Sequence, residues 1–564
     1  MDNIMKILLR KMDLRKNSGL YLYFGVIFIL FLFTRMYHIT SIPNGMHIDE
    51  VSMGYNTWSL SGFGTDRYNV SYPVYFNNAG SGQSCLYVYV AVLIAKLFGY
   101  SLFTLRITSV LFGLVLLVFG TKTAYEISGM KCAGFTAFFI TILPFFIMSE
   151  RWAFDCNAML PMFVMALYFF IKLLKTGRRR YAFLAGISFA LTLYSYILAL
   201  IIVPIFFIIA VIYSLLFKQL SYKNLLLVCL TGFVLALPIF IYCLVIFGIM
   251  PEFHIGPVSV TAASAGRISE LSWHGQTISG ILHNLKKLTT YDDYSFTAND
   301  RYGVGYMNVI YIFGCKLYIF SVLLFLSFSV IFVVSLYRVI KQKCFCYELL
   351  IVFYIISGLI PMLFIQQFAI YRYNAVFFGF VFVIAYFLYL LWKKKLWIVC
   401  CLFLLLSVYN FGSYIIYMFG GDFSSDYQSL KYFDKDLLDI CEKFDFGAYD
   451  AVYIDDTTTY NTGLIVTYAM RIPPDTIDDD IQNMDSAGMI VRNVHIGIPD
   501  TVNPDERALY IIRDVQTETF VYTDAYNQVH LWESLVNNNK IKQKLLQLNS
   551  KYEIYNNYYI LKTT

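Results

Sequence analysis

Two adjacent carboxylates follow the first apolar segment of the chain. Asp49 and Glu50 lie about ten residues past the apolar run 20–38, in the stretch HIDEVSMGYN, with His47 beside them. A carboxylate close to a hydroxyl group can act as a general base and take its proton during group transfer. Acidic residues also favour the first turn of any helix, so a helix N-terminus is the alternative interpretation of the pair. We expect one of the two carboxylates to serve as a general base for an acceptor hydroxyl.

Four arginines lie at the ends of apolar segments opposite to those that carry most basic residues. They are Arg35, Arg106, Arg151 and Arg372. An ionised side chain at membrane depth is costly and usually has a partner, and guanidinium groups bind phosphate through paired, charge-assisted hydrogen bonds. We predict that the four converge on a lipid phosphate and stabilise it as a leaving group. The alternative is that each one snorkels to the membrane interface.

Further polar residues cluster near these positions. Arg151 and Asp155 are four residues apart in SERWAFDCNAMLP and would pair on one face of a helix. Asp292 and Asp293 belong to a polar set in a long loop over 249–306, for which a solvated loop is the alternative. His47 and the acids beside it could hold a divalent metal, but no established ligand spacing is present, so the sequence establishes no cofactor.

Composition places these residues in a membrane protein. The chain is 58% hydrophobic and 14% charged, with a mean hydropathy of +0.61. These values exclude a soluble enzyme and a disordered chain, and they favour an all-α polytopic membrane body. We place eleven spans near 20–38, 103–121, 133–149, 158–175, 181–197, 199–216, 224–248, 307–337, 349–367, 371–391 and 396–419.

The basic loops orient the predicted spans. Every second loop is rich in lysine and arginine, which predicts a cytoplasmic N-terminus and an extracytoplasmic C-terminal region in the plasma membrane. The first outer loop is long and ends in the apolar stretch CLYVYVAVLIAKLFGYS, which contains Lys96. This stretch is short for a crossing, so we expect an interfacial helix there and not a twelfth span.

The last part of the chain has a different composition. Residues 420–564 carry 23 acidic and 12 basic residues, a net charge of −11, against +17 for the remainder. We therefore divide the chain into a membrane domain, 1–419, and an extracytoplasmic α/β domain, 420–564. Strands are expected at YDAVYIDD, ALYIIRD and YEIYNNYYILK, and helices at DYQSLKYFDKDLLDICEKF and ESLVNNNKIKQKLLQL.

Four segments together resemble the GT-C glycosyltransferases, and most closely the bacterial protein O-mannosyltransferase and aminoarabinose-transferase (ArnT-like) group. HIDEVSMGYN resembles the Asp-Glu signature of the first outer loop in that group. CLYVYVAVLIAKLFGYSLFTLRITSVLFGL resembles its interfacial helix and second span, MSERWAFDCNAMLPMFV its Arg-Trp segment, and AIYRYNAVFFGFVFV the start of a late span. The resemblance covers roughly residues 1–390 and implies the GT-C fold.

The resemblance also implies roles for residues. Asp49 would be the general base and Glu50 would support it or bind substrate. The donor would be a polyprenyl-phosphate sugar whose phosphate faces the arginines, and the anomeric carbon would be inverted by direct displacement. The predicted donor-phosphate set is Arg106, Arg151, Arg372 and Arg35. The predicted substrate-binding set is His47, Asp155, Asn157, Lys96, Asp292, Asp293 and Asn374.

The sequence thus predicts an integral membrane glycosyltransferase, a hexosyl- or pentosyltransferase acting at the outer face of the membrane. Its partners would be the polyprenyl-phosphate-sugar donor, membrane lipid and an acceptor that is a wall polymer, polysaccharide, glycolipid or protein. No nucleic acid is expected, because the chain has no basic stripe or zinc pattern. The alternatives are a lipid-linked sugar flippase or exporter and a non-catalytic envelope protein.

Overall fold

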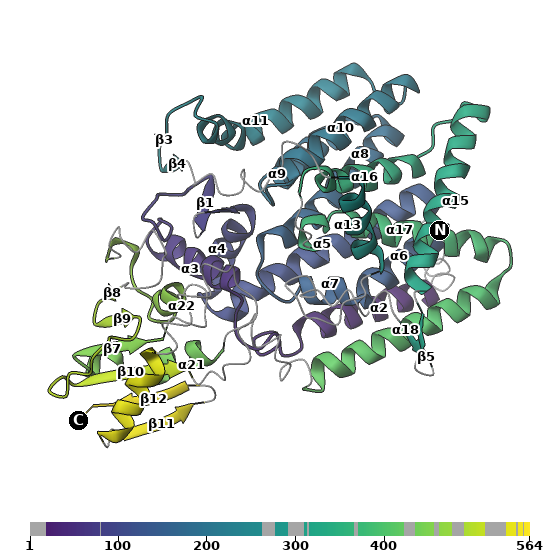
Figure 1. Cartoon of the computed structure of the whole chain (residues 1–564). Helices are drawn as coiled ribbons and strands as arrows, with labels where there is room; N and C mark the ends of the chain where they lie inside the picture. The colour runs from purple at the N-terminus through teal and green to yellow at the C-terminus, as the bar shows by residue number, and fades with distance from the viewer. Residues whose placement is uncertain are drawn as a thin grey trace, which may run out of the picture.

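A computed structural model gives the fold as a helical body with a small sheet unit at its C-terminal end (Figure 1). It describes residues 18–78, 81–261, 277–290, 310–312, 315–317, 319–365, 370–421, 435–455, 462–476, 490–513, 537–548, 551–555 and 558–563.

Long apolar helices make up the body. Within the described residues, 8 helical segments are long and apolar enough to cross a membrane. They contain α2 (Ser18–Met36), α5 (Leu102–Ser128), α8 (Met159–Thr176), α10 (Ala199–Leu216), α11 (Tyr222–Ile246), α15 (Ile319–Gln342), α17 (Val376–Lys393) and α18 (Trp397–Phe419). The predicted multi-span helical body is confirmed.

Shorter helices occupy three of the other predicted spans. They are α6 (Met130–Ile142), α9 (Arg179–Leu193) and α16 (Glu348–Leu359). The predicted span 133–149 is broken, because Pro144 cannot donate a backbone hydrogen bond and instead starts a new short helix, α7 (Pro144–Ser149). This break brings the residues after α7 to the end of α2.

The prediction of a single helix over 307–337 is wrong at its start. Two short strands, β5 (Ile310–Ile312) and β6 (Cys315–Leu317), pair antiparallel there, and α15 begins only at Ile319. The segment is rich in isoleucine and tyrosine, which favour strands. A short apolar strand cannot be separated from a helix by apolar periodicity alone.

The first outer loop is an ordered structure of its own. It contains α3 (Ile48–Gly62), the antiparallel strands β1 (Tyr75–Asn78) and β2 (Ser81–Ser84), and α4 (Leu86–Phe98). Most of α3 is buried, and α4 packs against both α3 and α5. The expected helix after the acidic pair and the expected short apolar helix are therefore both present, while the place of α4 at a membrane interface stays a prediction.

The C-terminal unit is built on a mixed sheet with the strand order β11-β12-β10-β7-β9-β8. Its strands are β7 (Ala451–Ile454), β8 (Ile490–Val491), β9 (Val494–Ile496), β10 (Ala508–Arg513), β11 (Lys551–Tyr555) and β12 (Tyr558–Lys562). The predicted strands at β7 and β10 are confirmed. YEIYNNYYILK contains two antiparallel strands, β11 and β12, and not the expected single one.

Helices complete this unit and join it to the first outer loop. Helices α21 (Asp436–Lys443) and 537–547 fall within the two predicted helical segments, and α22 (Thr462–Ala469) contacts α3. The Tyr100 hydroxyl donates to that of Tyr468 on α22 at 2.9 Å. A Cβ atom at Gly54 would lie 2.7 Å from the Tyr100 hydroxyl oxygen and 2.9 Å from the Tyr468 ring. Apolar residues of the loop and of the C-terminal unit share one core, so α3 and this unit pack as one body.

Candidate active site

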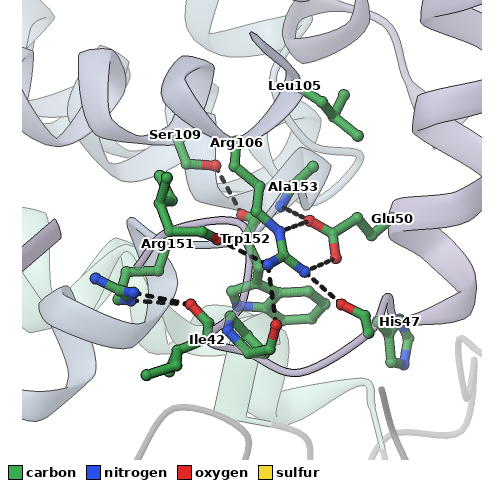
Figure 2. Close-up of polar contacts among 12 residues, drawn as sticks. Ile42, His47, Glu50, Leu105, Arg106, Ser109, Arg151, Trp152 and Ala153 are labelled. Atoms are coloured by element: carbon green, nitrogen blue, oxygen red, sulfur yellow. Dashed lines mark hydrogen bonds and ion pairs between the residues drawn. The ribbon is translucent and has the colours of Figure 1, made fainter. Parts of the chain in front are cut away.

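A buried ion pair fixes the start of α3 (Figure 2). Glu50 receives two hydrogen bonds of 2.8 Å from the Nε and Nη2 atoms of Arg106, and its Oε1 also accepts the backbone N–H of Ala153 at 2.9 Å. The other donors of Arg106 bind the carbonyls of Ile39, Pro43 and Gly45. All five N–H donors of this guanidinium are therefore used, and Arg106 ties α5 both to α3 and to the chain that leads into α3.

Arg151 caps the C-terminus of the first span. Its guanidinium donates only to backbone carbonyls, which belong to Thr34, Arg35, Tyr37 and Ile42. The last carbonyls of a helix have no partner within the helix, and a cation there is also favoured by the helix dipole. Arg151 therefore satisfies the end of α2 and the turn that follows it, and it does not form the expected helical pair with Asp155.

Arg35 likewise binds the free carbonyls at the end of another helix, α6. Its Nε donates to Oε2 of Glu150 at 2.7 Å, and its other donors reach the carbonyls of Ile140 and Thr141 at the end of α6. Its side chain is fully buried. The interruption of α6 before Pro144 leaves these carbonyls without helical partners. Arg35 donates hydrogen bonds to them instead.

Phosphate binding by Arg35, Arg106 and Arg151 stays a prediction. In this structure their guanidinium groups are fully buried and hold protein oxygen atoms. Each would have to release a carboxylate or carbonyl acceptor to bind a phosphate. Their geometry favours a positioning role, in which they fix the first outer loop against the membrane body.

Asp49 has a different environment from its neighbour. It lies in the first turn of α3, and its side chain is 23% exposed. Oδ1 accepts a hydrogen bond of 3.0 Å from Nδ2 of Asn78, at the end of β1. The backbone N–H of Asp49 donates to Nδ1 of His47 at 3.1 Å, and the same Nδ1 lies 3.4 Å from Oδ2 of the Asp49 carboxylate. The carboxylate is thus held in place without an arginine or lysine ion pair in the described part of the chain.

The hairpin of β1 and β2 connects Asp49 with the second predicted polar cluster. Oδ2 of Asp155 accepts the backbone N–H of Ser84 at 3.0 Å, where β2 ends. Asp155 starts the short helix η1 (Asp155–Ala158), and the carbonyl of Cys156 in that helix accepts Nδ2 of Asn374 at 2.5 Å. The structure therefore joins Asp49, Asp155 and Asn374 through one series of contacts between the loop and the body.

Aromatic rings lead from this region to Arg372. The His47 ring lies 5.2 Å from that of Trp152, which stacks on Phe154 at 4.9 Å, and Phe154 meets Tyr371 edge to face at 5.3 Å. Arg372 follows Tyr371 in the helix η3 (Ile370–Tyr373) and is 7% exposed. The contact of Tyr371 with Phe154 therefore places η3, which contains Arg372, beside residues that are distant in sequence.

The remaining predicted residues divide into three groups. Asn157 donates to the carbonyl of Trp152 at 3.2 Å and belongs to the same region. Lys96 is exposed in the last turn of α4, and no described contact joins it to the others. Asp292 and Asp293 lie outside the described residues. Among the residues that the structure describes, no group of three metal-ligating side chains is present.

Sequence reasoning missed Asn78 and Glu150. Asn78 lies in the polar run FNNAGSGQS, which follows a strand-like segment, and only the pairing of β1 with β2 brings it to Asp49. Glu150 is in the quoted segment SERWAF, directly before Arg151. Its position after a proline-containing apolar run was the signal that could have identified it as a partner for a buried cation.

The turn after α3 contains a carboxyl with a perturbed pKa. Burial raises the pKa of Asp66 to about 6, against the opposing effect of the hydrogen bonds that its Oδ1 accepts from the N–H groups of Tyr68 and Val70. This turn continues toward β1 and so helps to position Asn78.

Comparisons with known proteins agree with this architecture. Residues 83–242 match the family model described as dolichyl-phosphate-mannose-protein mannosyltransferase. ArnT from Cupriavidus metallidurans is 12% identical in the apo state, with a TM-score of 0.54 and an alignment that covers 98% of both chains. Its structure bound to undecaprenyl phosphate has the same identity and TM-score and covers 97% of this chain and 98% of ArnT.

A second structural relative is larger than this chain. The Archaeoglobus fulgidus oligosaccharyltransferase tethered to an acceptor peptide is 14% identical, with a TM-score of 0.51, over 87% of this chain and 69% of that one. This chain spans 64% of the same protein in its apo form. A search of curated proteins finds no match. The chain therefore has the GT-C fold of ArnT, and the family match over residues 83–242 confirms the resemblance in its sequence.

Proposed function

We propose that this chain is an integral membrane glycosyltransferase that moves a sugar from a polyprenyl-phosphate donor to an acceptor at the outer face of the membrane. The fold shared with ArnT and the mannosyltransferase family match support this proposal. ArnT has been solved with undecaprenyl phosphate bound, which supports a lipid phosphate as part of the donor. The alternation of basic loops supports the outer face as the side of the reaction.

The contrast between Asp49 and Glu50 carries the proposal. Glu50 is buried and paired with Arg106, whereas the Asp49 carboxylate is partly exposed and positioned by Asn78. A general base must reach the acceptor proton, and a partly exposed carboxylate on a rigid helix can do so. Asp49 is therefore assigned as the base and Glu50 as a positioning residue that holds the first turn of α3.

The reaction is a direct displacement at the anomeric carbon. Asp49 takes the proton from the acceptor hydroxyl while the oxygen of that hydroxyl forms a bond to the anomeric carbon. The bond from that carbon to the donor phosphate oxygen breaks on the opposite face, and its electron pair stays with the phosphate. Polyprenyl phosphate is released and the configuration at the sugar is inverted.

Arg372 is assigned to the leaving phosphate. Its side chain belongs to η3, which packs next to the aromatic series from His47 to Tyr371, and it is 7% exposed. A guanidinium in a partly desolvated site stabilises the charge that develops on the leaving oxygen. Asp155, Asn157 and Asn374 line the same region and are assigned to substrate positioning.

The test is sugar transfer by purified protein in lipid vesicles. Polyprenyl-phosphate hexoses and pentoses are supplied beside nucleotide sugars, with a crude envelope fraction as the source of acceptors. Wild type and Asp49→Asn are compared with Asp500→Asn, a matched change at an exposed aspartate of the C-terminal unit. Consumption of lipid donors alone, by wild type and Asp500→Asn but not by Asp49→Asn, supports the proposal. Failure of every preparation to consume a donor would instead favour a flippase or a non-catalytic envelope protein.

A further inference from the structure

Arg67 is a buried cation whose hydrogen-bonding capacity is largely unused. Its exposed fraction is 4%, and neither Nε nor Nη1 has a hydrogen-bond partner. Nη2 donates to the hydroxyl of Tyr68 at 3.0 Å, and the guanidinium carbon lies 4.9 Å from the centre of that ring. Because Nε carries one hydrogen and Nη1 and Nη2 carry two each, four of its five N–H donors lack an acceptor among the described residues. By contrast, the arginines of the active site use their N–H donors in hydrogen bonds to protein oxygen atoms.

Within the described residues, no carboxylate is hydrogen-bonded to the Arg67 guanidinium, although the charge of the adjacent Asp66 interacts with it at longer range. No ion pair joins Arg67 to a carboxylate in the described part of the chain. The neighbouring Asp66 directs its Oδ1 to the backbone N–H groups of Tyr68 and Val70, each at 2.9 Å. Buried N–H donors without an acceptor are costly. The arrangement is therefore that of a site for an anion that comes from outside the chain.

A rigid turn holds Arg67 in this position. The backbone N–H of Arg67 donates to Oδ1 of Asn56 on α3 at 3.1 Å, and the N–H of Asp66 donates to the carbonyl of Val70 at 2.9 Å. Asn69 has a left-handed φ of 58°, which this residue type tolerates better than most. The cation is therefore preorganised, which lowers the cost of ordering it around a ligand.

The turn lies where the first outer loop meets the C-terminal unit. Tyr55, next to Asn56 on α3, donates its hydroxyl to the carbonyl of Ile472, just after α22. Asn56 is seven residues after Asp49 on the same helix, which corresponds to about 10 Å along its axis. Asn56, which accepts the backbone N–H of Arg67, thus lies at a distance from Asp49 that one or two sugar rings can span.

We propose that Arg67 binds a carboxylate or phosphate group of the acceptor, so that this protein selects anionic acceptors. The inference rests on the proposed function, because it requires that the sugar be transferred at Asp49 to an acceptor molecule bound along α3. The acceptor is favoured over the donor phosphate as the source of the anion. A donor phosphate is tied to its prenyl tail in the membrane, while Arg67 belongs to a turn joined to the C-terminal unit through α3.

The site opens through Tyr68, whose half-buried ring lies over the guanidinium. Rotation of this side chain exposes the cation without a change in the backbone turn. The Tyr68 hydroxyl then gives up its bond to Nη2, and the anion takes its place.

The first arm of the test measures anion binding to the full-length protein in detergent. Inorganic phosphate, glucuronate and neutral glucose are titrated while thermal unfolding is followed, for wild type, Arg67→Gln, Arg67→Lys and Arg507→Gln. Arg507 is an exposed arginine of the C-terminal unit and serves as the matched control. Phosphate or glucuronate, but not glucose, should stabilise wild type and Arg507→Gln. Arg67→Gln should bind the anion at least about ten-fold more weakly, and Arg67→Lys should retain part of the affinity.

The second arm separates acceptor from donor. Hydrolysis of the polyprenyl-phosphate sugar with water as acceptor should have the same KM in wild type and Arg67→Gln, while transfer to the envelope fraction should fall about ten-fold or more. A raised KM for the donor would assign the anion to the donor phosphate and overturn the proposal. Equal anion binding by wild type and Arg67→Gln would overturn it as well.

Failure of the proposed function gives a distinguishable result. If no variant consumes a donor but Arg67→Gln still loses anion binding, the anion site is supported and the proposal of glycosyl transfer at Asp49 is overturned. Arg67→Lys protects the test against a variant that does not fold, because it keeps the charge in the turn.

Discussion

Arg151 completes the end of α2, the helix that contains Arg35, and Arg35 completes the end of α6, the helix that precedes α7 and Arg151. Arg151 binds the carbonyls of Thr34 and Arg35 at the end of α2. Arg35 in turn binds Glu150, the residue before Arg151, together with two carbonyls at the end of α6. The two cations therefore join α2, α6 and α7 at the edge of the body from which the first outer loop departs.

Replacement of Arg151 should destabilise the protein strongly. Arg151→Gln loses most of the hydrogen bonds to the end of α2 and leaves buried carbonyls without donors. We expect a loss of about 3 kcal/mol in the free energy of unfolding, measured as a reduced thermal midpoint and lower yield in detergent. The control is Arg180→Gln, an exposed arginine in the first turn of α9. Equal midpoints for the two variants would contradict the capping role.

Gly113 on α5 should not tolerate even a methyl group. A Cβ atom there would lie 2.4 Å from Cδ of Glu150, the partner of Arg35, and the buried carboxyl cannot move without loss of that ion pair. Gly113→Ala should therefore cost about 1–3 kcal/mol in stability. Gly25→Ala on α2 has no atom within 4 Å of the new methyl group and should be neutral or slightly stabilising. Thermal unfolding of both variants in one detergent measures the difference, and a neutral Gly113→Ala would show that Glu150 has room to shift.

Asp66 should make stability fall as the pH rises. Its folded-state pKa of about 6 lies above the ordinary value of 3.8, so the folded chain keeps this proton after the unfolded chain has lost it. Its stabilising contribution is complete below about pH 4, declines between about pH 4 and 6, and is lost above that range, with a total on the order of 3 kcal/mol.

Asp66→Asn removes this titration, because the amide oxygen can still accept from Tyr68 and Val70. The difference in thermal midpoint between this variant and wild type should shift in favour of the variant from pH 4.5 to pH 7. Asp500→Asn, at an exposed position, should follow the wild type throughout. A difference that stays constant with pH would place the titration elsewhere.

The sequence correctly predicted those helices and strands whose local residue pattern is compatible with only one type of secondary structure. The apolar runs predict the long helices, and the acidic pair correctly marks the start of α3. The short apolar runs of β7 and β10, rich in isoleucine, valine and tyrosine, likewise identify strands. Each of these depends on neighbours in the chain, through periodicity or through a helix N-terminus.

The sequence was uninformative where a side chain meets a distant backbone. The arginines were expected to gather around a phosphate, because their position at the ends of spans looks the same whether the acceptor is a lipid or a protein carbonyl. Arg106 finds its carboxylate 56 residues away, and Arg151 finds its carbonyls more than 100 residues away. Those acceptors come within reach only because the span breaks at Pro144 and because the first outer loop folds against the helical body.

The strongest test of the site compares Asp49 with Glu50. Asp49→Asn keeps the shape of a partly exposed side chain and should abolish transfer while the thermal midpoint stays close to that of wild type. Glu50→Gln leaves the buried Arg106 without its counter-charge, so it should lower stability by about 3 kcal/mol and reduce transfer through misplacement of α3.

Arg106→Lys separates the two explanations for Glu50, because it retains the charge but not the paired geometry with the carboxylate. If Glu50 acts by positioning α3, Arg106→Lys should impair both stability and transfer, as Glu50→Gln does. If Glu50 is itself the base, Glu50→Gln should abolish transfer with Asp49→Asn still active, and Arg106→Lys should affect mainly stability. Measurement of transfer and thermal unfolding on the same preparations decides between them, because the base and its positioning partner predict opposite combinations of the two losses.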